Sequence, residues 1–231
     1  AVQMKIIACW FLAVVAMCST AVAGTFDFVI QTTADAQRYA FRVENASDFT
    51  IDWGDGNVET GLSGTAVRSH VYAVAGTYTN KVSGVASCIA FGGDGGTTPL
   101  LLRDIVSKMD DGVTGITSAY KMFNGAKNIT QFTQADWFDA ASSNVVNMAE
   151  MFTNASNFNQ DLNGWKTGKV TTMWMMFESA SAFNGNISSW DVGKVASMGN
   201  MFLSASKFNQ DIGDWAVSNV TSMASMFRSA A

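Results

Sequence analysis

The chain is 231 residues long and carries a formal net charge of −5, from 14 basic and 19 acidic residues. It contains no basic run, so a nucleic-acid partner is not expected. His70 is the only histidine, which excludes a zinc site built from several histidines.

Residues 1–23 are predicted to be a signal peptide. Lys5 supplies a positive charge, residues 6–15 form an apolar run, and Ala21-Val22-Ala23 has the small-x-small pattern of a cleavage site. The apolar run is too short for a spanning helix, and no later stretch is long and apolar enough to be one.

The sequence therefore predicts a secreted or cell-surface protein with cleavage after Ala23. Lipidation at Cys18 is an alternative, although Met17 stands where bacterial lipoproteins carry a small residue. Cleavage leaves Cys88 as the only cysteine, so we expect no intramolecular disulfide and a fold held by its core or its repeats.

Residues 24–90 contain short runs rich in β-branched and aromatic residues, with turn residues between them. The runs cover 26–30, 39–43, 49–53 and 77–82. This alternation of strand-like runs and turn residues predicts a small antiparallel β-sandwich.

Three patches of this segment carry a family resemblance. They are Ile51-Asp-Trp-Gly-Asp-Gly56, Ser69-His-Val-Tyr72 and Ala75-Gly-Thr-Tyr-Thr79, and the first contains a tight glycine turn. They resemble polycystic-kidney-disease (PKD)-like β-sandwich domains, whose pattern is W-G-D-G followed by H-x-Y and G-x-Y-T. The resemblance implies a sandwich fold for residues 24–90.

Asp52 and Asp55 place two carboxylates beside this turn. A functional role for them would be a Ca²⁺ site or an acid–base pair. The alternative, which we favour, is that both carboxylates accept hydrogen bonds within the turn. His70 is predicted to be a structural residue bonded near Trp53. No metal and no cofactor are expected.

A glycine-rich linker is predicted at residues 91–99, which hold four glycines and the only proline. Leu100–Ile105 is predicted to be the first strand of a repeat array that fills 100–231 and ends within a repeat. This atypical first unit, which continues through Ile116–Phe123, is expected to cap the N-terminal end of the array.

A 25-residue repeat organises that array. Its Met-Phe pairs and its tryptophans recur at equal spacing, at Met151-Phe152, Met176-Phe177, Met201-Phe202 and Met226-Phe227 and at Trp165, Trp190 and Trp215. The first pair, Met122-Phe123, lies 29 residues before the second, so the first copy contains a four-residue insertion. A fixed period of this size indicates a stack of repeats.

Each repeat is predicted to combine a short helix with a short strand. Met173, Met176/Phe177 and Ala180 follow helical spacing, and Thr171 and Thr172 are candidate N-caps. Ile187-x-x-Trp190-x-Val192 has the spacing of a leucine-rich-repeat strand. The expected fold class is therefore α/β, a leucine-rich-repeat-like solenoid of 25-residue strand–helix units behind a small all-β sandwich.

The repeated aromatic residues are predicted to be core ladders. A tryptophan ladder also suits sugar stacking, but the tryptophans occupy the slot where leucine normally points inward. Asn159, Asn184 and Asn209 are expected to form an interior ladder whose amides satisfy backbone groups. Trp137 and Trp174 lie off the tryptophan ladder and remain candidates for a sugar platform.

Phe158-Asn-Gln-Asp-Leu162, Phe208-Asn-Gln-Asp-Ile212, Trp190-Asp-Val192 and Ser218-Asn-Val-Thr-Ser-Met223 carry a second resemblance. They resemble the BspA-type leucine-rich-repeat surface proteins of bacteria, whose unit reads F-N-Q-D-I-S-x-W-D-V-S-N-V-T-x-M-x-x-M-F. That family implies adhesion or recognition at the cell surface and supplies no catalytic residues.

We therefore expect a non-enzymatic, exported bacterial surface protein whose repeats bind an extracellular protein or a surface glycan. The predicted strand face offers small polar residues that differ between repeats, and its candidate binding residues are Lys166, Ser189, Asp191, Asp214 and Ser218. A carbohydrate-binding module and a passive spacer are the alternatives. No catalytic constellation is evident.

Overall fold

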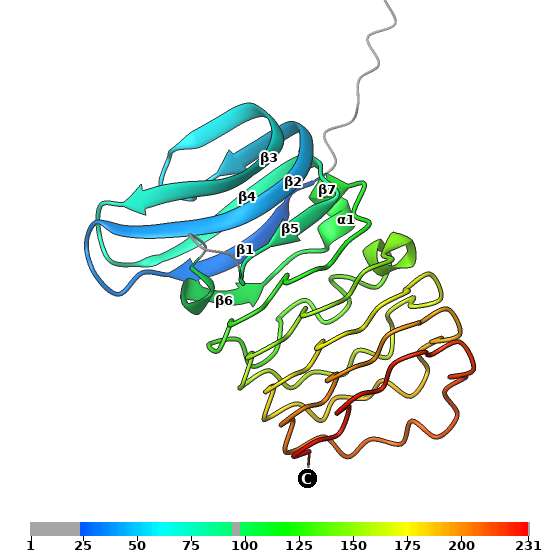
Figure 1. Cartoon of the computed structure of the whole chain (residues 1–231). Coiled ribbons are helices and arrows are strands. Elements are labelled where there is room, and N and C mark those ends of the chain that lie inside the picture. The colour runs from blue at the N-terminus through cyan, green and yellow to red at the C-terminus, as the bar shows by residue number, and fades with distance from the viewer. Residues whose placement is uncertain (1–23, 94–97, 231) are drawn as a thin grey trace, which may run out of the picture.

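The computed structural model describes residues 24–93 and 98–230 and has two parts, a β-sheet and a stack of irregular coils (Figure 1). The sheet contains seven strands, which are β1 (Phe26–Gln31), β2 (Gln37–Asp52), β3 (Val58–Tyr72), β4 (Thr77–Val85), β5 (Cys88–Ala90), β6 (Leu102–Ile105) and β7 (Val113–Thr114). The helical segments are the four-residue α1 (Met109–Gly112) and two 3-10 turns, η1 (Pro99–Leu101) and η2 (Ala141–Asn144). The predicted signal peptide lies outside the described residues.

The strand order is β3-β2-β4-β1-β6, antiparallel throughout, with β5 paired to β2 and β7 paired in parallel to β4. All seven strands belong to one hydrogen-bonded sheet, where the sequence predicted two packed sheets. The long strand β2 merges two predicted runs and branches the sheet. Its first half pairs with β5 and its second half with β4.

Two of these strands come from beyond the predicted linker. Leu100–Ile105 was expected to begin the repeats, but β6 within it pairs antiparallel with β1 and extends the sheet. The apolar core also continues from the sheet into the coils, because the Phe91 ring stacks on Phe123 at 5.6 Å and the Phe26 ring on Trp137 at 6.1 Å. The first coil therefore closes the open side of the sheet.

The prediction of strand–helix units is wrong. Within the described part of residues 115–230 there is no α-helix and no strand. The β-pairing between successive coils there consists of single parallel bridges, which link Ser118, Asn147, Thr172, Ser197 and Ser222. A coil here means one repeat beginning at such a bridge residue, 29 residues long in the first coil, which starts at Ser118, and 25 in the following ones. The bridge at Thr172 lies where a helix N-cap was expected.

The backbone of the predicted helix shows why it does not form. Met175 and Ser179 have φ of 56° and 58°, in the left-handed region, and the equivalent residues of the other coils share it. Alternate amides then leave the coil: the Phe177 N–H donates to the Met201 carbonyl of the next coil at 2.9 Å. The intervening amides close turns of three residues, such as Glu178 N–H to Met175 O at 3.1 Å. A helix would have directed all of these amides along its own axis.

The predicted interior residues are nevertheless buried. Phe152, Phe177 and Phe202 stack in parallel at 5.5 and 5.7 Å, and the three ladder tryptophans are at most 7% exposed. The prediction that the aromatic ladders form the core is confirmed. The 29-residue first repeat accommodates its additional residues through η2, whose Ser142 hydroxyl accepts a hydrogen bond from the Lys166 N–H at 2.7 Å.

Candidate recognition surface

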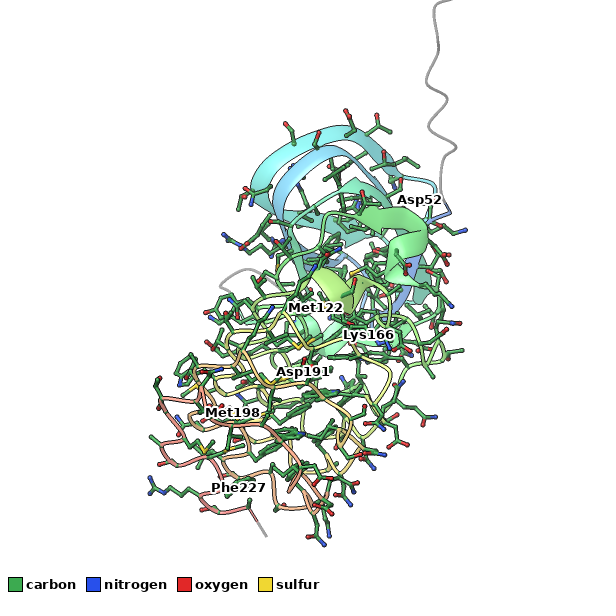
Figure 2. All side chains as sticks on the ribbon, turned by 90° about the vertical axis from the view of Figure 1, so that its right-hand side faces the viewer. Asp52, Met122, Lys166, Asp191, Met198 and Phe227 are labelled. Atoms are coloured by element: carbon green, nitrogen blue, oxygen red, sulfur yellow. The ribbon has the colours of Figure 1, made fainter. Side chains whose placement is uncertain are left out.

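The five candidate residues of the repeats are all exposed. We call this set the recognition face: Lys166, Ser189, Asp191, Asp214 and Ser218. In Figure 2, Lys166 and Asp191 lie on successive coils, between Asp52 at the sheet end and Phe227 at the far end of the stack. Their exposure is as predicted, but a strand does not carry them.

Two turns with an extended link between them position this face. The Trp165 N–H closes one turn on the Leu162 carbonyl at 3.1 Å, and the Val170 N–H closes the other on Thr167 at 2.8 Å. Between them, buried Trp165 and Thr167 flank exposed Lys166. The alternation of buried and exposed residues is strand-like, but the neighbouring coils connect here mainly through side chains, as in the Thr167 Oγ1 to Asp191 O bond of 2.9 Å.

Side chains of adjacent coils fix part of the recognition face. The Ser189 N–H donates to Asn163 Oδ1 at 2.9 Å, and the Ser189 hydroxyl donates to the Asn163 carbonyl at 2.7 Å. A Cβ at Gly168 would lie 2.8 Å from Asp191 Oδ2, so that carboxylate lies over the glycine of the preceding coil. Within the described residues, the side chains of Asp214 and Ser218 make no hydrogen bond. Neighbouring coils therefore restrain Ser189 and Asp191 of the recognition face, whereas Asp214 and Ser218 are not held by side-chain hydrogen bonds.

Asp139 also belongs near this face, although sequence reasoning did not include it. A Cβ at Gly164 would collide with the Asp139 carboxylate, so that carboxylate packs directly against the backbone of Gly164. Burial and the nearby Asp136 raise the pKa of Asp139, and the charges of Lys166 and Lys108 oppose that shift. Asp136 itself is paired with Lys108 at 2.6 Å. The first coil thus brings negative charge close to Lys166.

The asparagine series lines a second, open polar surface of the coils. The Asn184 N–H donates to Asn159 Oδ1, and the Asn209 N–H donates to Asn184 Oδ1, each at 2.8 Å. The predicted backbone hydrogen bonding is confirmed, but the ladder is not interior, because Asn159 and Asn209 are exposed. Asn159 and Asn184 border a shallow groove that also includes Ser156, Ser181 and Ser206.

The turn at Asp52 and Asp55 is held by hydrogen bonds, as favoured from the sequence. Asp52 Oδ1 accepts from the Gly54 N–H at 2.8 Å, and Asp55 Oδ1 accepts from the Asn57 N–H at 3.1 Å. His70 Nε2 lies 2.6 Å from Asp55 Oδ2, and its ring stacks on Trp53 at 5.3 Å. The structural role predicted for His70 is confirmed. In the described part of the chain, no three His, Cys, Asp or Glu side chains gather in a way that could hold a metal ion.

The two tryptophans that lie off the ladder differ in exposure. Trp137 is fully buried and cannot belong to a sugar platform, whereas Trp174 is 38% exposed. Phe227 is the other strongly exposed large aromatic side chain among the described residues. A flat array of exposed rings is therefore absent from the part of the coil stack that the structure describes.

No helix within residues 24–93 and 98–230 has the length and apolar character needed to cross a membrane. Searches of curated proteins and of solved structures found no match to the chain. A family model does match residues 117–231, with the description "Mycoplasma protein of unknown function, DUF285". The matched segment spans the coils and is consistent with a repeat-containing bacterial protein. Over residues 117–231 the chain is thus similar to this family, whose description assigns no activity.

Proposed function

We propose that this protein is exported to the bacterial surface and recognises a macromolecular partner through the exposed side chains of its coils. The observation that supports the proposal most strongly is the contrast between neighbouring columns, where a column means the equivalent residues of successive coils. The buried column Trp165, Trp190 and Trp215 does not vary. The adjacent exposed column reads Lys166, Asp191 and Ala216.

This contrast favours recognition over a purely structural role for the surface. The core column must keep its residue type, because each indole packs on the next at 6.0 and 6.3 Å. The exposed column changes from a cation to an anion to a methyl group without altering the coil. A fixed lattice with variable side chains suits a large partner that touches several coils at once.

A protein partner is favoured over a glycan. A sugar-stacking site needs two or three exposed rings in one plane. Among the described residues of the coils, the large exposed rings are those of Trp174 and of Phe227 at the far end of the stack. The recognition face instead carries charges of both signs at Lys166, Asp191 and Asp214. Complementary charge contributes specificity and association rate in protein–protein binding.

The experiment that tests the proposal is a binding screen of the purified full chain against two panels, extracellular proteins and polysaccharides. A protein ligand supports it. A polysaccharide ligand whose binding is lost in Trp174→Ala supports the carbohydrate alternative. The absence of binding to either panel favours the spacer alternative.

A further inference from the structure

The two edges of the sheet differ in whether another part of the chain covers them. At the β6 edge, the Gln134 N–H donates to the Ile105 carbonyl at 3.1 Å and the Thr133 N–H donates to Asp104 Oδ1 at 2.7 Å, so the first coil covers this edge. At the other edge, β3 pairs only with β2 within the described residues. Figure 1 shows β3 at the end of the sheet far from the coil stack.

The pairing of β2 identifies which backbone groups of β3 point outward. The Ala40 N–H donates to Thr98 Oγ1 at 2.8 Å, and the Ala40 carbonyl accepts from the Thr98 N–H at 3.0 Å. Both groups of Ala40 therefore point away from β3, and its register partner Ser69 is not hydrogen-bonded to it. Because antiparallel bonding alternates along a strand, Val67, Ser69 and Val71 direct their N–H and C=O groups to the open edge.

This part of the edge is regular and unprotected. Residues 66–72 pair with β2 without a register shift, whereas the shifts all fall in the other half of β3. The strand contains no Lys and no Pro, which are usual protections of a free edge. Arg68 faces inward and its guanidinium turns back to the Ser63 carbonyl at 2.8 Å, so it does not extend across the edge.

We propose that β3 is a self-association site, where β3 of a second copy adds antiparallel across a two-fold axis at Ser69. An isologous contact requires a self-complementary surface, so that residue i meets j and j meets i. In this register Ser69 lies opposite Ser69 of the second copy. Val67 of each copy lies opposite Val71 of the other, which gives two equivalent valine pairs. All three pairs are of the hydrogen-bonded type, since these residues carry the outward groups.

The side chains of this register are mutually compatible. The valine pairs lie on the outer face, where Val71 is 53% exposed in a single copy and gains apolar contact in the pair. On the inner face, Arg68 comes opposite His70 of the second copy, whose imidazole is held by the Asp55 carboxylate. Arg68 Nε is buried and has no hydrogen-bond partner in the described part of the chain. Asp55 of the second copy therefore brings negative charge toward a cation with an unused donor.

The dimer keeps both coil stacks available. Since β3 lies on the edge opposite the one that the coils cover, pairing through it leaves both recognition faces open. Two faces on one particle would raise the apparent affinity for a multivalent or surface-bound partner. A single strand pair is a small interface, so we expect a concentration-dependent dimer.

The first test is the molar mass of the full chain in solution, measured by sedimentation equilibrium over a range of concentrations. We expect a mass approaching twice 24.7 kDa. Val71→Lys places a charge at each apolar pair and should weaken association at least tenfold, whereas Val146→Lys, at an exposed valine of the coils, should not. A monomer at every concentration, or equal weakening by both variants, would overturn the proposal.

The second test uses the symmetry axis. Paired residues of this type have Cα atoms about 5.5 Å apart, which is within disulfide range. Ser69→Cys, made with Cys9→Ser and Cys18→Ser, should cross-link to itself under mild oxidation. Ser63→Cys in the same background serves as the control, because its β3 position is far from the axis. Equal cross-linking of the two variants, or none at position 69, would contradict this register.

Discussion

The indole rings of Trp165 and Trp190 lie 6.0 Å apart and within 10° of parallel, although 25 residues separate them in the chain. Each ring packs on the next coil, and the Trp190 Nε1–H donates to the Leu162 carbonyl of the previous coil at 2.9 Å. Trp190 therefore supplies both apolar contact and a hydrogen bond between coils, whereas the buried Nε1–H groups of Trp165 and Trp215 have no hydrogen-bond partner among the described residues.

Trp190→Ala should cost about 3–5 kcal/mol of unfolding free energy, because a buried tryptophan leaves a cavity that the stacked coils cannot close. Urea denaturation followed by circular dichroism measures this cost. Trp174→Ala is the control and should cost far less, since that ring is 38% exposed. Comparable losses in the two variants would contradict the assignment of the Trp190 ring to the core.

Ser179 distinguishes the coil from a helix. Its φ of 58° is disfavoured for any residue with a Cβ, so Ser179→Gly should be more stable than Ser179→Ala by about 1 kcal/mol. In a helix the order would be reversed by a similar amount. Thermal denaturation of the two variants gives the sign directly. A more stable alanine variant would restore the strand–helix repeat.

Asn184 should contribute through its side-chain carbonyl. Asn184→Ala leaves the Asn209 N–H and Gln210 Nε2 without their acceptor. We expect the free energy of unfolding to fall by about 1 kcal/mol, because these groups are partly accessible to water. Asn184→Asp keeps an oxygen in place and should retain most of the stability. Chemical denaturation of the three proteins tests this order, and equal loss in both variants would show that the acceptor is unimportant.

Asp55 should give the sheet a dependence on acid pH. Burial tends to raise the pKa of this carboxyl, but hydrogen bonds from His70 and Asn57 outweigh burial and hold the pKa below its ordinary value of 3.8. A depressed folded-state pKa adds stability above the unfolded-state pKa, and that stability is lost as the pH falls through the folded-state value. In Asp55→Asn, melting temperature should therefore fall less steeply below pH 4 than in the unaltered chain. Parallel curves would contradict the linkage.

The sequence predicted the interior of the coils better than their backbone. Met173, Met176 and Ala180 lie on the inner side, as helical spacing implied, because short turns also bring residues three to four apart to one side. The left-handed residues could not be foreseen, since position 175 and its equivalents are occupied by Lys, Glu, Met, Asn and Ser. Only the interactions between coils select that conformation.

The sheet was predictable only in part. The strands with alternating buried aromatic residues, such as β1 and the two halves of β2, were expected from their composition. Strand β3 was not, because Gly61 and Gly64 and its polar residues resemble a loop, and its pairing partner β2 decides its structure. The exposure of Lys166 and Asp191 was foreseeable from the alternation around the tryptophans, whereas the place of Asp139 depends on η2 and was not.

The measurement that tests the central claim most directly compares two matched variants for binding to the partner found in the screen. Lys166→Gln/Asp191→Asn/Asp214→Asn neutralises the recognition face, and Lys207→Gln/Asp161→Asn/Asp211→Asn neutralises one exposed cation and two exposed anions of the coils that do not belong to it. We predict that the dissociation constant rises at least tenfold for the first variant, about 1.4 kcal/mol, and stays unchanged for the second. Loss of binding in the second variant alone, or in neither, would contradict recognition through this face.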